Sequence, residues 1–362
     1  MYKKNYKEKK WYRLDNTAKV FPIISNKKSS NVFRVSVSLN NNIIKEKLQL
    51  ALDKTLPFFK TFQVNLKKGF FWYYFETNSK KVTIDKENKY PCSYMNFKEQ
   101  NKFLFKVTYY KNRINLEVFH SLTDGSGAIE FLKAITYNYI KLVKYNKQEK
   151  LSLTDLDFAL DNEDSYVKNY SNLHLNLNKT NKAYLIKSRK LPLYSISVIS
   201  GYMNINELLT LCRSKNVTIT EYITTLLISS IYSEYQSHTK NKDNIKIFIP
   251  VNLRKYFDSS TNLNFFSSID IDTNLNENKS SFNELLKKIQ LQFKEKLTKD
   301  HLSKKISNNV SAEQNIFVRL LPLPIKTIGV KIAYNLQKNS HTSTISNLGI
   351  IDIKDEFKTE IN

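Results

Sequence analysis

The sequence contains little cysteine, glycine or proline, with two, six and seven residues respectively among 362. Cys92 and Cys212 stand far apart and outside any paired motif. This argues against a disulfide framework and a cysteine-based zinc site, and it is typical of a protein of the reducing cytoplasm. No run of about 18 apolar residues occurs, so no transmembrane helix is predicted. The basic N-terminus also lacks the apolar stretch of a signal peptide.

Acidic residues are also scarce relative to basic ones, with 33 Asp and Glu against 57 Lys and Arg, a formal net charge of +24. Only seven of the basic residues are arginines, and the lysines are spread along the whole chain. Sequence-specific DNA readers depend on arginine forks, so this pattern argues against nucleic acid as the main partner. A positive field does attract an anionic small substrate, and it is compatible with peripheral contact with anionic lipid.

What is present is a globular composition, with 41% hydrophobic and 25% charged residues. The length predicts two domains or lobes. Strand-like and helix-like stretches mix without strict alternation, which predicts an α/β fold of two lobes. A polar segment rich in Asn and Ser, residues 161–181, is the best linker candidate. We therefore expect an N-terminal lobe over residues 1–170 and a C-terminal lobe over residues 171–362.

Hydrophobic periodicity predicts the individual elements. The expected strands are Val32–Leu39, Gly69–Glu76, Phe103–Tyr110, Ile114–Phe119, Leu193–Tyr202, Ile245–Val251 and Ser343–Ile353. The expected helices cover residues 128–139, a mostly buried segment after a Thr218–Glu221 capping box, residues 282–296, and residues 312–336 with interruptions at Pro322 and Pro324.

The segment from His120 to Gly127, HSLTDGSG, is the strongest candidate for a site. Ile114, Leu116 and Val118 alternate along the preceding strand, and His120 continues their inward face. Two of the six glycines follow and indicate a tight turn or a positive φ before the next helix. A histidine at a strand end beside such a turn is suited to act as a general base.

A buried core histidine followed by an Asp-Gly turn explains the same spacing, so the residues alone leave both readings open. Asp124 is expected to hold the loop by pairing with a buried arginine, and Arg13 and Arg254 are the candidates. Competing chemistries lack their motifs, because the sequence contains no G-x-S-x-G elbow, H-E-x-x-H helix, phosphate loop or G-x-G-x-x-G turn. No metal site is predicted.

HSLTDGSGAIEFL resembles the H-x-x-x-D-G motif of the chloramphenicol acetyltransferase-like superfamily of CoA-dependent acyltransferases and condensation domains. The resemblance is closest to its bacterial alcohol acetyltransferase-like branch and covers most of the chain. Four further segments look like landmarks of that branch in the right order: WYRLDNTAKVFP, GFFWYYFE, IPVNLRKYF and TSTISNLGI.

The resemblance implies two lobes, each with a mixed sheet backed by helices, and a tunnel between them. It implies an acyl-CoA-dependent O- or N-acyltransferase, with acyl-CoA as co-substrate and no tightly bound cofactor. His120 would be the base that activates an alcohol or amine, Asp124 the structural residue of the loop, and Gly125 the turn. Thr344, Ser346 and Asn347 would face the site, where one of them donates to the oxyanion.

Two features depart from this pattern. Members of the family usually continue well past the SNLG segment, whereas this sequence stops at Asn362, so either this branch is short or the sequence is truncated. A missing strand would leave an open sheet edge and a less enclosed tunnel. Position 119 is Phe, where condensation domains commonly carry a second histidine. This difference counts against a condensation-type domain with a carrier-bound acyl donor. That domain and an inactive acyl-CoA-binding homologue are the two alternatives.

The segment from Phe317 to Leu336 is basic and amphipathic. Contact with a membrane surface is one interpretation of this pattern. Packing of the helix on its own domain is the expectation that we prefer, because most amphipathic stripes of soluble proteins face their own core.

Overall fold

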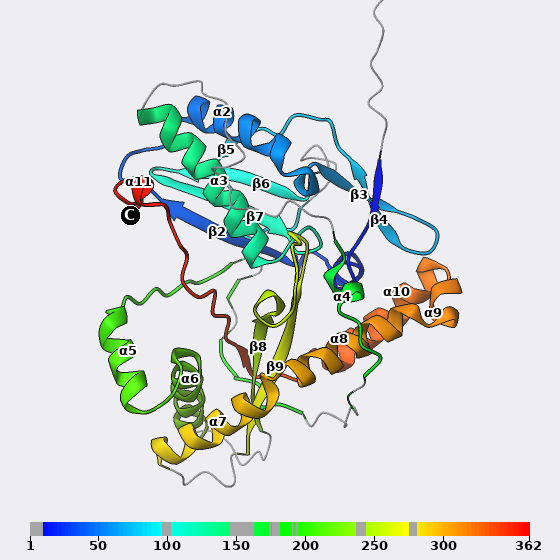
Figure 1. Cartoon of the computed structure of the whole chain (residues 1–362), viewed down its shortest axis with the longest axis vertical. Coiled ribbons are helices and arrows are strands. Elements are labelled where there is room, and N and C mark those ends of the chain that lie inside the picture. The colour runs from blue at the N-terminus through cyan, green and yellow to red at the C-terminus, as the bar shows by residue number, and fades with distance from the viewer. Residues whose placement is uncertain are drawn as a thin grey trace, which may run out of the picture.

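The computed structural model describes residues 10–95, 103–144, 163–173, 175, 182–189, 191–192, 195–236, 244–274 and 281–362. These residues form two lobes, each built on a β-sheet with helices packed against it (Figure 1). The predicted mixed α/β architecture is confirmed. No helix in the described part of the chain is both long and apolar enough to cross a membrane.

The first lobe contains a four-stranded sheet in the order β2-β7-β6-β5 and a three-stranded sheet in the order β1-β4-β3. Helices α2 and α3 lie together on one face of the four-stranded sheet (Figure 1). The elements of this lobe are β1 (Trp11–Arg13), α1 (Phe21–Ile24), β2 (Val32–Ser38), α2 (Lys45–Thr55), β3 (Val64–Lys68), β4 (Tyr73–Thr77), β5 (Asp85–Lys86), β6 (Phe105–Tyr110), β7 (Arg113–Phe119) and α3 (Gly125–Lys144).

The hairpin of β6 and β7 forms where the sequence predicts it. Its turn carries Lys111 with a φ of 50°. β7 pairs with β2 on its other side, with Val118 opposite Phe33. Because successive side chains of a strand point to opposite faces, Val118 and Phe33 face α3 together. The helix predicted over residues 128–139 is part of α3, and its apolar positions are buried against this sheet.

The second lobe contains a three-stranded sheet in the order β10-β8-β9, in which β8 pairs parallel to β10 and antiparallel to β9. Helices α6, α7 and α8 contact this sheet, and α5 packs on α6. The elements are α4 (Ser165–Lys168), α5 (Ile205–Ser214), α6 (Ile219–Gln236), β8 (Ile245–Asn252), β9 (Phe266–Thr273), α7 (Phe282–Lys296), α8 (Lys299–Gln314), α9 (Ile316–Leu320), α10 (Leu323–Gln337), β10 (Ser343–Thr344) and α11 (Asp355–Lys358).

Local signals placed several of these elements correctly. The Thr218–Glu221 capping box before α6 is present, with both of its hydrogen bonds made, at 2.7 and 3.2 Å. The predicted helix over residues 282–296 is α7. Near the C-terminus the helical segment breaks at Pro322, which caps α10, but Pro324 lies in the first turn and does not interrupt the helix. A first-turn proline is tolerated because its missing N–H has no partner within the helix.

Three predicted strands are wrong in extent. Residues 69–72 form the turn between β3 and β4, where the Gly69 amide donates to the Trp72 carbonyl. Residues 195–202 form no strand, because no other described strand pairs with them. Tyr202 in this segment is 96% exposed. Leu193 lies outside the described residues. Of the predicted strand Ser343–Ile353, only Ser343 and Thr344 are in a ladder.

Each lobe also takes residues from the other's predicted range. Tyr166, in the predicted linker, is buried in the second-lobe core, and its hydroxyl both donates to and accepts from the backbone of Phe266. Phe357 is buried in the first-lobe core, where it stacks on Tyr137. Residues 161–162, 174 and 176–181 of the predicted linker lie outside the described residues.

Candidate active site

His120, Asp124 and Arg254 lie where a loop of each lobe meets the other. In the first lobe this is the loop between β7 and α3, which carries His120 and Asp124. In the second lobe it is the connection between β8 and β9, which carries Arg254, Asn264 and Phe265. Figure 1 shows this connection reaching the first lobe beside the start of α3.

Asp124 joins the two loops. Its Oδ2 accepts from Arg254 Nη1 at 2.7 Å and from the backbone N–H of Phe265 at 3.0 Å, and its Oδ1 accepts from the N–H of Gly127 at 3.2 Å. Arg254 is therefore the partner of Asp124. Arg13 is exposed on β1, opposite Tyr74, and makes no such bond. Because the carboxylate is almost fully buried, this network fixes the loop rather than taking part in chemistry.

The glycines of the loop act through close packing, not through unusual dihedral angles. Neither Gly125 nor Gly127 has a positive φ, which corrects the expectation of a glycine-dependent turn at Gly125. A Cβ at Gly127 would clash with Thr123 and would lie 2.7 Å from the Asn262 carbonyl oxygen. At Gly125 the nearest atom to a Cβ would be a methyl group of Leu348, at 3.3 Å. Gly127 is thus the position at which the lobes come too close for a side chain.

The His120 ring is held between aromatic side chains from both lobes. Phe21 stacks on it at a centroid distance of 4.5 Å and an angle of 16°. Phe33 lies at 5.0 Å and Phe266 at 5.4 Å. Burial among these rings lowers the pKa of His120, while its hydrogen bonds and the charge of Asp124 act in the opposite direction. The imidazole is therefore neutral at pH 7, as a general base must be.

The tautomer of His120 follows from its neighbours. Nδ1 lies 3.2 Å from Oδ1 of Asn264. An amide oxygen only accepts hydrogen bonds, so Nδ1 carries the proton and Nε2 keeps its lone pair. A neutral histidine with a free Nε2 can accept a proton from a hydroxyl or an amine.

The orientation of the Asn264 amide is fixed in turn by Asp15. Asp15 is buried, and its Oδ2 accepts from Nδ2 of Asn264 at 3.1 Å and from the Asn264 backbone N–H at 3.3 Å. Its Oδ1 accepts from the N–H of Ala18 at 2.7 Å. With Nδ2 bonded to Asp15, the amide turns Oδ1 towards His120. Burial raises the pKa of Asp15 to about 7.

Sequence reasoning did not assign a role to Asp15 or Asn264. Asp15 is the only acidic residue of the quoted segment WYRLDNTAKVFP, and this was an available signal. Asn264 lies in a polar, loop-like stretch with no local pattern, and its role depends on contacts 144 and 249 residues away in sequence.

The side chains of the predicted residues Thr344, Ser346 and Asn347 are exposed, and within the described residues no hydrogen bond joins them to the His120 loop. The Asn347 amide instead donates to Thr220 at the start of α6, at 2.8 Å. The neighbouring Leu348 does contact this region, beside Gly125.

An apolar cavity of about 440 Å³ lies close to the site. It is bounded by β2, by α3 and by the segment that returns to the first lobe, and its apolar lining includes Val35, Ile129 and Leu348. Val35 follows Phe33 on the same face of β2, about 6.6 Å further along the strand. The cavity therefore begins at Val35, which is the next residue on this face of β2 after Phe33, whose ring contacts His120.

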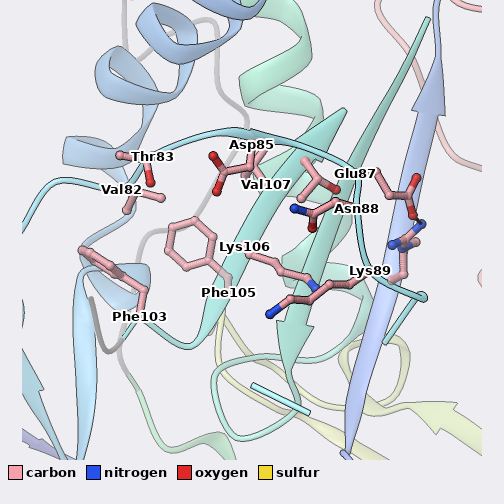
Figure 2. Close-up of a pocket in the computed structure, with 12 residues that line it drawn as sticks. Val82, Thr83, Asp85, Glu87, Asn88, Lys89, Phe103, Phe105, Lys106 and Val107 are labelled. Atoms are coloured by element: carbon pink, nitrogen blue, oxygen red, sulfur yellow. Dashed lines mark hydrogen bonds and ion pairs between the residues drawn. The ribbon is translucent and has the colours of Figure 1, made fainter. Parts of the chain in front are cut away.

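A second cavity, of about 250 Å³, lies beside β5 and β6 of the first-lobe sheet (Figure 2). Several charged groups here are paired: Arg34 contacts Glu87 and Glu117, and Lys106 contacts Glu117, each at 2.5 Å. This cluster supports the sheet and is separate from His120. Among the described residues no group of three or more His, Cys, Asp or Glu side chains could hold a metal ion.

No family model matches the sequence, and no curated protein is similar to it. Several solved structures are similar in fold. F. graminearum TRI101, an acetyltransferase complexed with ethyl coenzyme A, has a TM-score of 0.62 at 8% identity, covering 96% of this chain and 86% of that chain. The starter condensation domain of rhizomide synthetase, in complex with C8-CoA, has 0.55 at 10%, covering 80% and 72%. Polyketide synthase associated protein 5 from Mycobacterium tuberculosis has 0.54 at 13%, covering 81% and 74%.

These likenesses show the fold. The chain has the two-lobed architecture of the CoA-dependent acyltransferase and condensation superfamily, as the H-x-x-x-D-G resemblance implied. In this chain the motif histidine lies between the lobes and its aspartate is paired with an arginine of the second lobe.

Proposed function

We propose that the protein is an acyltransferase that moves an acyl group from acyl-CoA to an alcohol or an amine, with His120 as the general base. The observation that carries the proposal is a neutral imidazole held at the junction of the lobes by Asn264 and Phe21, with no hydrogen-bond partner for Nε2 in the part of the chain that the structure describes. A core histidine kept only for packing needs no such defined tautomer.

The reaction balances without an added cofactor. As the acceptor oxygen or nitrogen attacks the thioester carbon, its proton passes to Nε2 of His120. The carbon–sulfur bond then breaks, and the proton passes on to the departing thiolate. The products are an ester or amide and free CoA. A positioned base of this kind contributes about 10² to 10⁴-fold to the rate.

Two further features support a thioester substrate. The formal net charge of +24 favours the approach of a phosphate-bearing molecule such as CoA. The apolar cavity of about 440 Å³ beside β2 and α3 has the size and lining to take the alkyl part of an acyl group or acceptor. We assign the oxyanion donor to the segment from Thr344 to Asn347, on the resemblance alone.

The test is release of free thiol from acetyl-CoA and longer acyl-CoA in the presence of a panel of alcohols and amines. We expect turnover by the wild type and a loss of about 10² to 10⁴-fold in kcat for His120→Ala. His301→Ala, on α8, is the matched control and retains activity. Both variants are expected to keep thermal midpoints close to that of the wild type.

Two results contradict the proposal. One is an absence of thiol release with every acceptor, and the other is full activity in His120→Ala. A large fall in the thermal midpoint of His120→Ala points instead to a core histidine. Comparing free acyl-CoA with a carrier-bound acyl group separates this proposal from condensation chemistry, for which the buried Phe119 leaves a single histidine in the motif.

A further inference from the structure

Helix α10 has two apolar faces, and only one of them is covered. Leu323 is fully buried, and Val330 and Tyr334 pack with it against α1. These positions recur at helical spacing. A second set, Ile325, Ile328, Ile332 and Leu336, recurs with the same spacing two residues out of phase, so it lies on the opposite side of the helix.

This second set is the exposed stripe of α10. Its side chains are between 51% and 80% exposed. Leu320 and Phe317, on the preceding helix α9, are 63% and 78% exposed. At 1.5 Å per residue the stripe extends for about 16 Å along α10. The segment therefore packs on its own domain, as expected, through one face of α10, while the other face is exposed.

The turn between β3 and β4 contacts α10 through Leu323 and Lys326. The Leu323 amide donates to the carbonyl of Phe70 at 2.8 Å. The buried amine of Lys326 donates to the carbonyls of Phe71 and Arg319 and lies 4.1 Å from the Trp72 ring centroid. These bonds join α9, α10 and the turn into one platform at the edge of the molecule (Figure 1).

The platform is cationic. Arg319, Lys331, Lys338 and, at the end of β3, Lys68 are exposed, and no acidic residue occurs between Glu313 and Asp352. Two copies of this surface would bring like charges together, which argues against self-association through it. Exposed aliphatic and aromatic side chains bordered by cations are instead complementary to a bilayer surface that carries anionic headgroups.

We infer that the platform formed by α9, α10 and the β3–β4 turn docks on anionic lipid membranes. The apolar stripe enters the boundary between headgroups and acyl chains, and the cations contact the headgroups. The helix lies in the plane of the surface, because its other face stays packed on α1. This inference does not depend on acyl transfer.

The test is co-sedimentation of the full chain with vesicles of phosphatidylcholine alone and with 30 mol% phosphatidylserine, at low and high salt. We expect binding to the anionic vesicles that weakens as salt is raised. Ile328→Glu with Ile332→Glu should weaken it at least about tenfold, because two inserted side chains become charged. Lys331→Glu with Lys338→Glu should weaken it about 25-fold, at about fivefold for each cation lost.

Matched controls carry equal changes elsewhere. Leu291→Glu with Ile205→Glu alters exposed apolar residues of α7 and α5, and Lys287→Glu with Lys288→Glu reverses exposed charges of α7. Both controls should bind as the wild type does, and circular dichroism checks that every variant is folded.

The inference is overturned if the wild type binds neither vesicle, or if the stripe variant binds as well as its control. It is also overturned if sedimentation shows a dimer that the stripe variant disrupts and no vesicle binding, because the surface would then be a contact between copies.

Discussion

Nδ2 of Asn264 donates to the buried carboxylate of Asp15 at 3.1 Å, and this bond sets which atom of the amide faces His120. With Nδ2 committed to Asp15, Oδ1 accepts from Nδ1 of His120. A carboxylate 105 residues before the histidine thereby fixes its tautomer through one amide. Asp15 and Asn264 are positioning residues in this arrangement.

Asn264→Ala removes the acceptor that faces His120. We expect kcat for acyl transfer to fall about 10- to 100-fold, by analogy with the loss of second-layer partners of functional histidines, while KM for acyl-CoA changes little. The bond to Asn264 raises the pKa of His120, so its loss lowers that pKa further and moves the acidic limb of the rate profile to lower pH. Asn283→Ala, on the surface of α7, is the control. An unchanged profile with reduced kcat would assign Asn264 a purely structural role.

Asp124→Ala leaves the Arg254 guanidinium without its carboxylate in a largely buried setting. We expect a loss of about 3 kcal/mol in the free energy of unfolding, measured by urea denaturation, with loss of activity. Lys304→Ala, which breaks an exposed pair on α8, should cost less than about 0.5 kcal/mol. Asp124→Ala combined with Arg254→Met should regain part of the stability. Equal stability of Asp124→Ala and wild type would contradict the assigned role.

Gly127→Ala and Gly125→Ala form a matched pair in the same helical turn. At Gly127 the added methyl group meets Thr123 and the Asn262 backbone, so we expect a loss of about 1 to 3 kcal/mol from overpacking. At Gly125 it meets only a movable Leu348 methyl group, and the change should stay within about 1 kcal/mol. Thermal or urea unfolding measures both. The reverse order would show that the two loops do not approach as described.

Asp15 predicts a pH dependence of stability. Its pKa is about 7 in the folded protein, above the value of about 3.9 for an unfolded chain. Between these values the folded state holds a proton that the unfolded state has lost, so this group's stabilising contribution declines as pH rises from about 4 to 7. The decline relative to Asp15→Asn should total about 4 kcal/mol. A wild-type minus variant difference that is flat over this range would place Asp15 in a more solvated setting.

Much of the fold could be predicted because its signals are local. The alternation along β7, the helical period of α3 and the capping box before α6 each depend on neighbours within a few residues. The strand predicted over residues 193–202 is absent from its described part, residues 195–202, because an alternating pattern of apolar residues does not supply a partner strand. Tyr166 was assigned to a linker because its neighbours in the sequence are polar, although its ring is buried.

The sequence by itself determined the class of fold, the histidine at the end of β7 and the pairing of Asp124 with one of two arginines. Only the tertiary structure decided that Arg254 is that partner, that Asp15 and Asn264 orient His120, and that one apolar face of α10 stays uncovered. The physical reason is separation along the chain. These contacts join residues more than 100 positions apart, so they exist only once the two lobes are packed together.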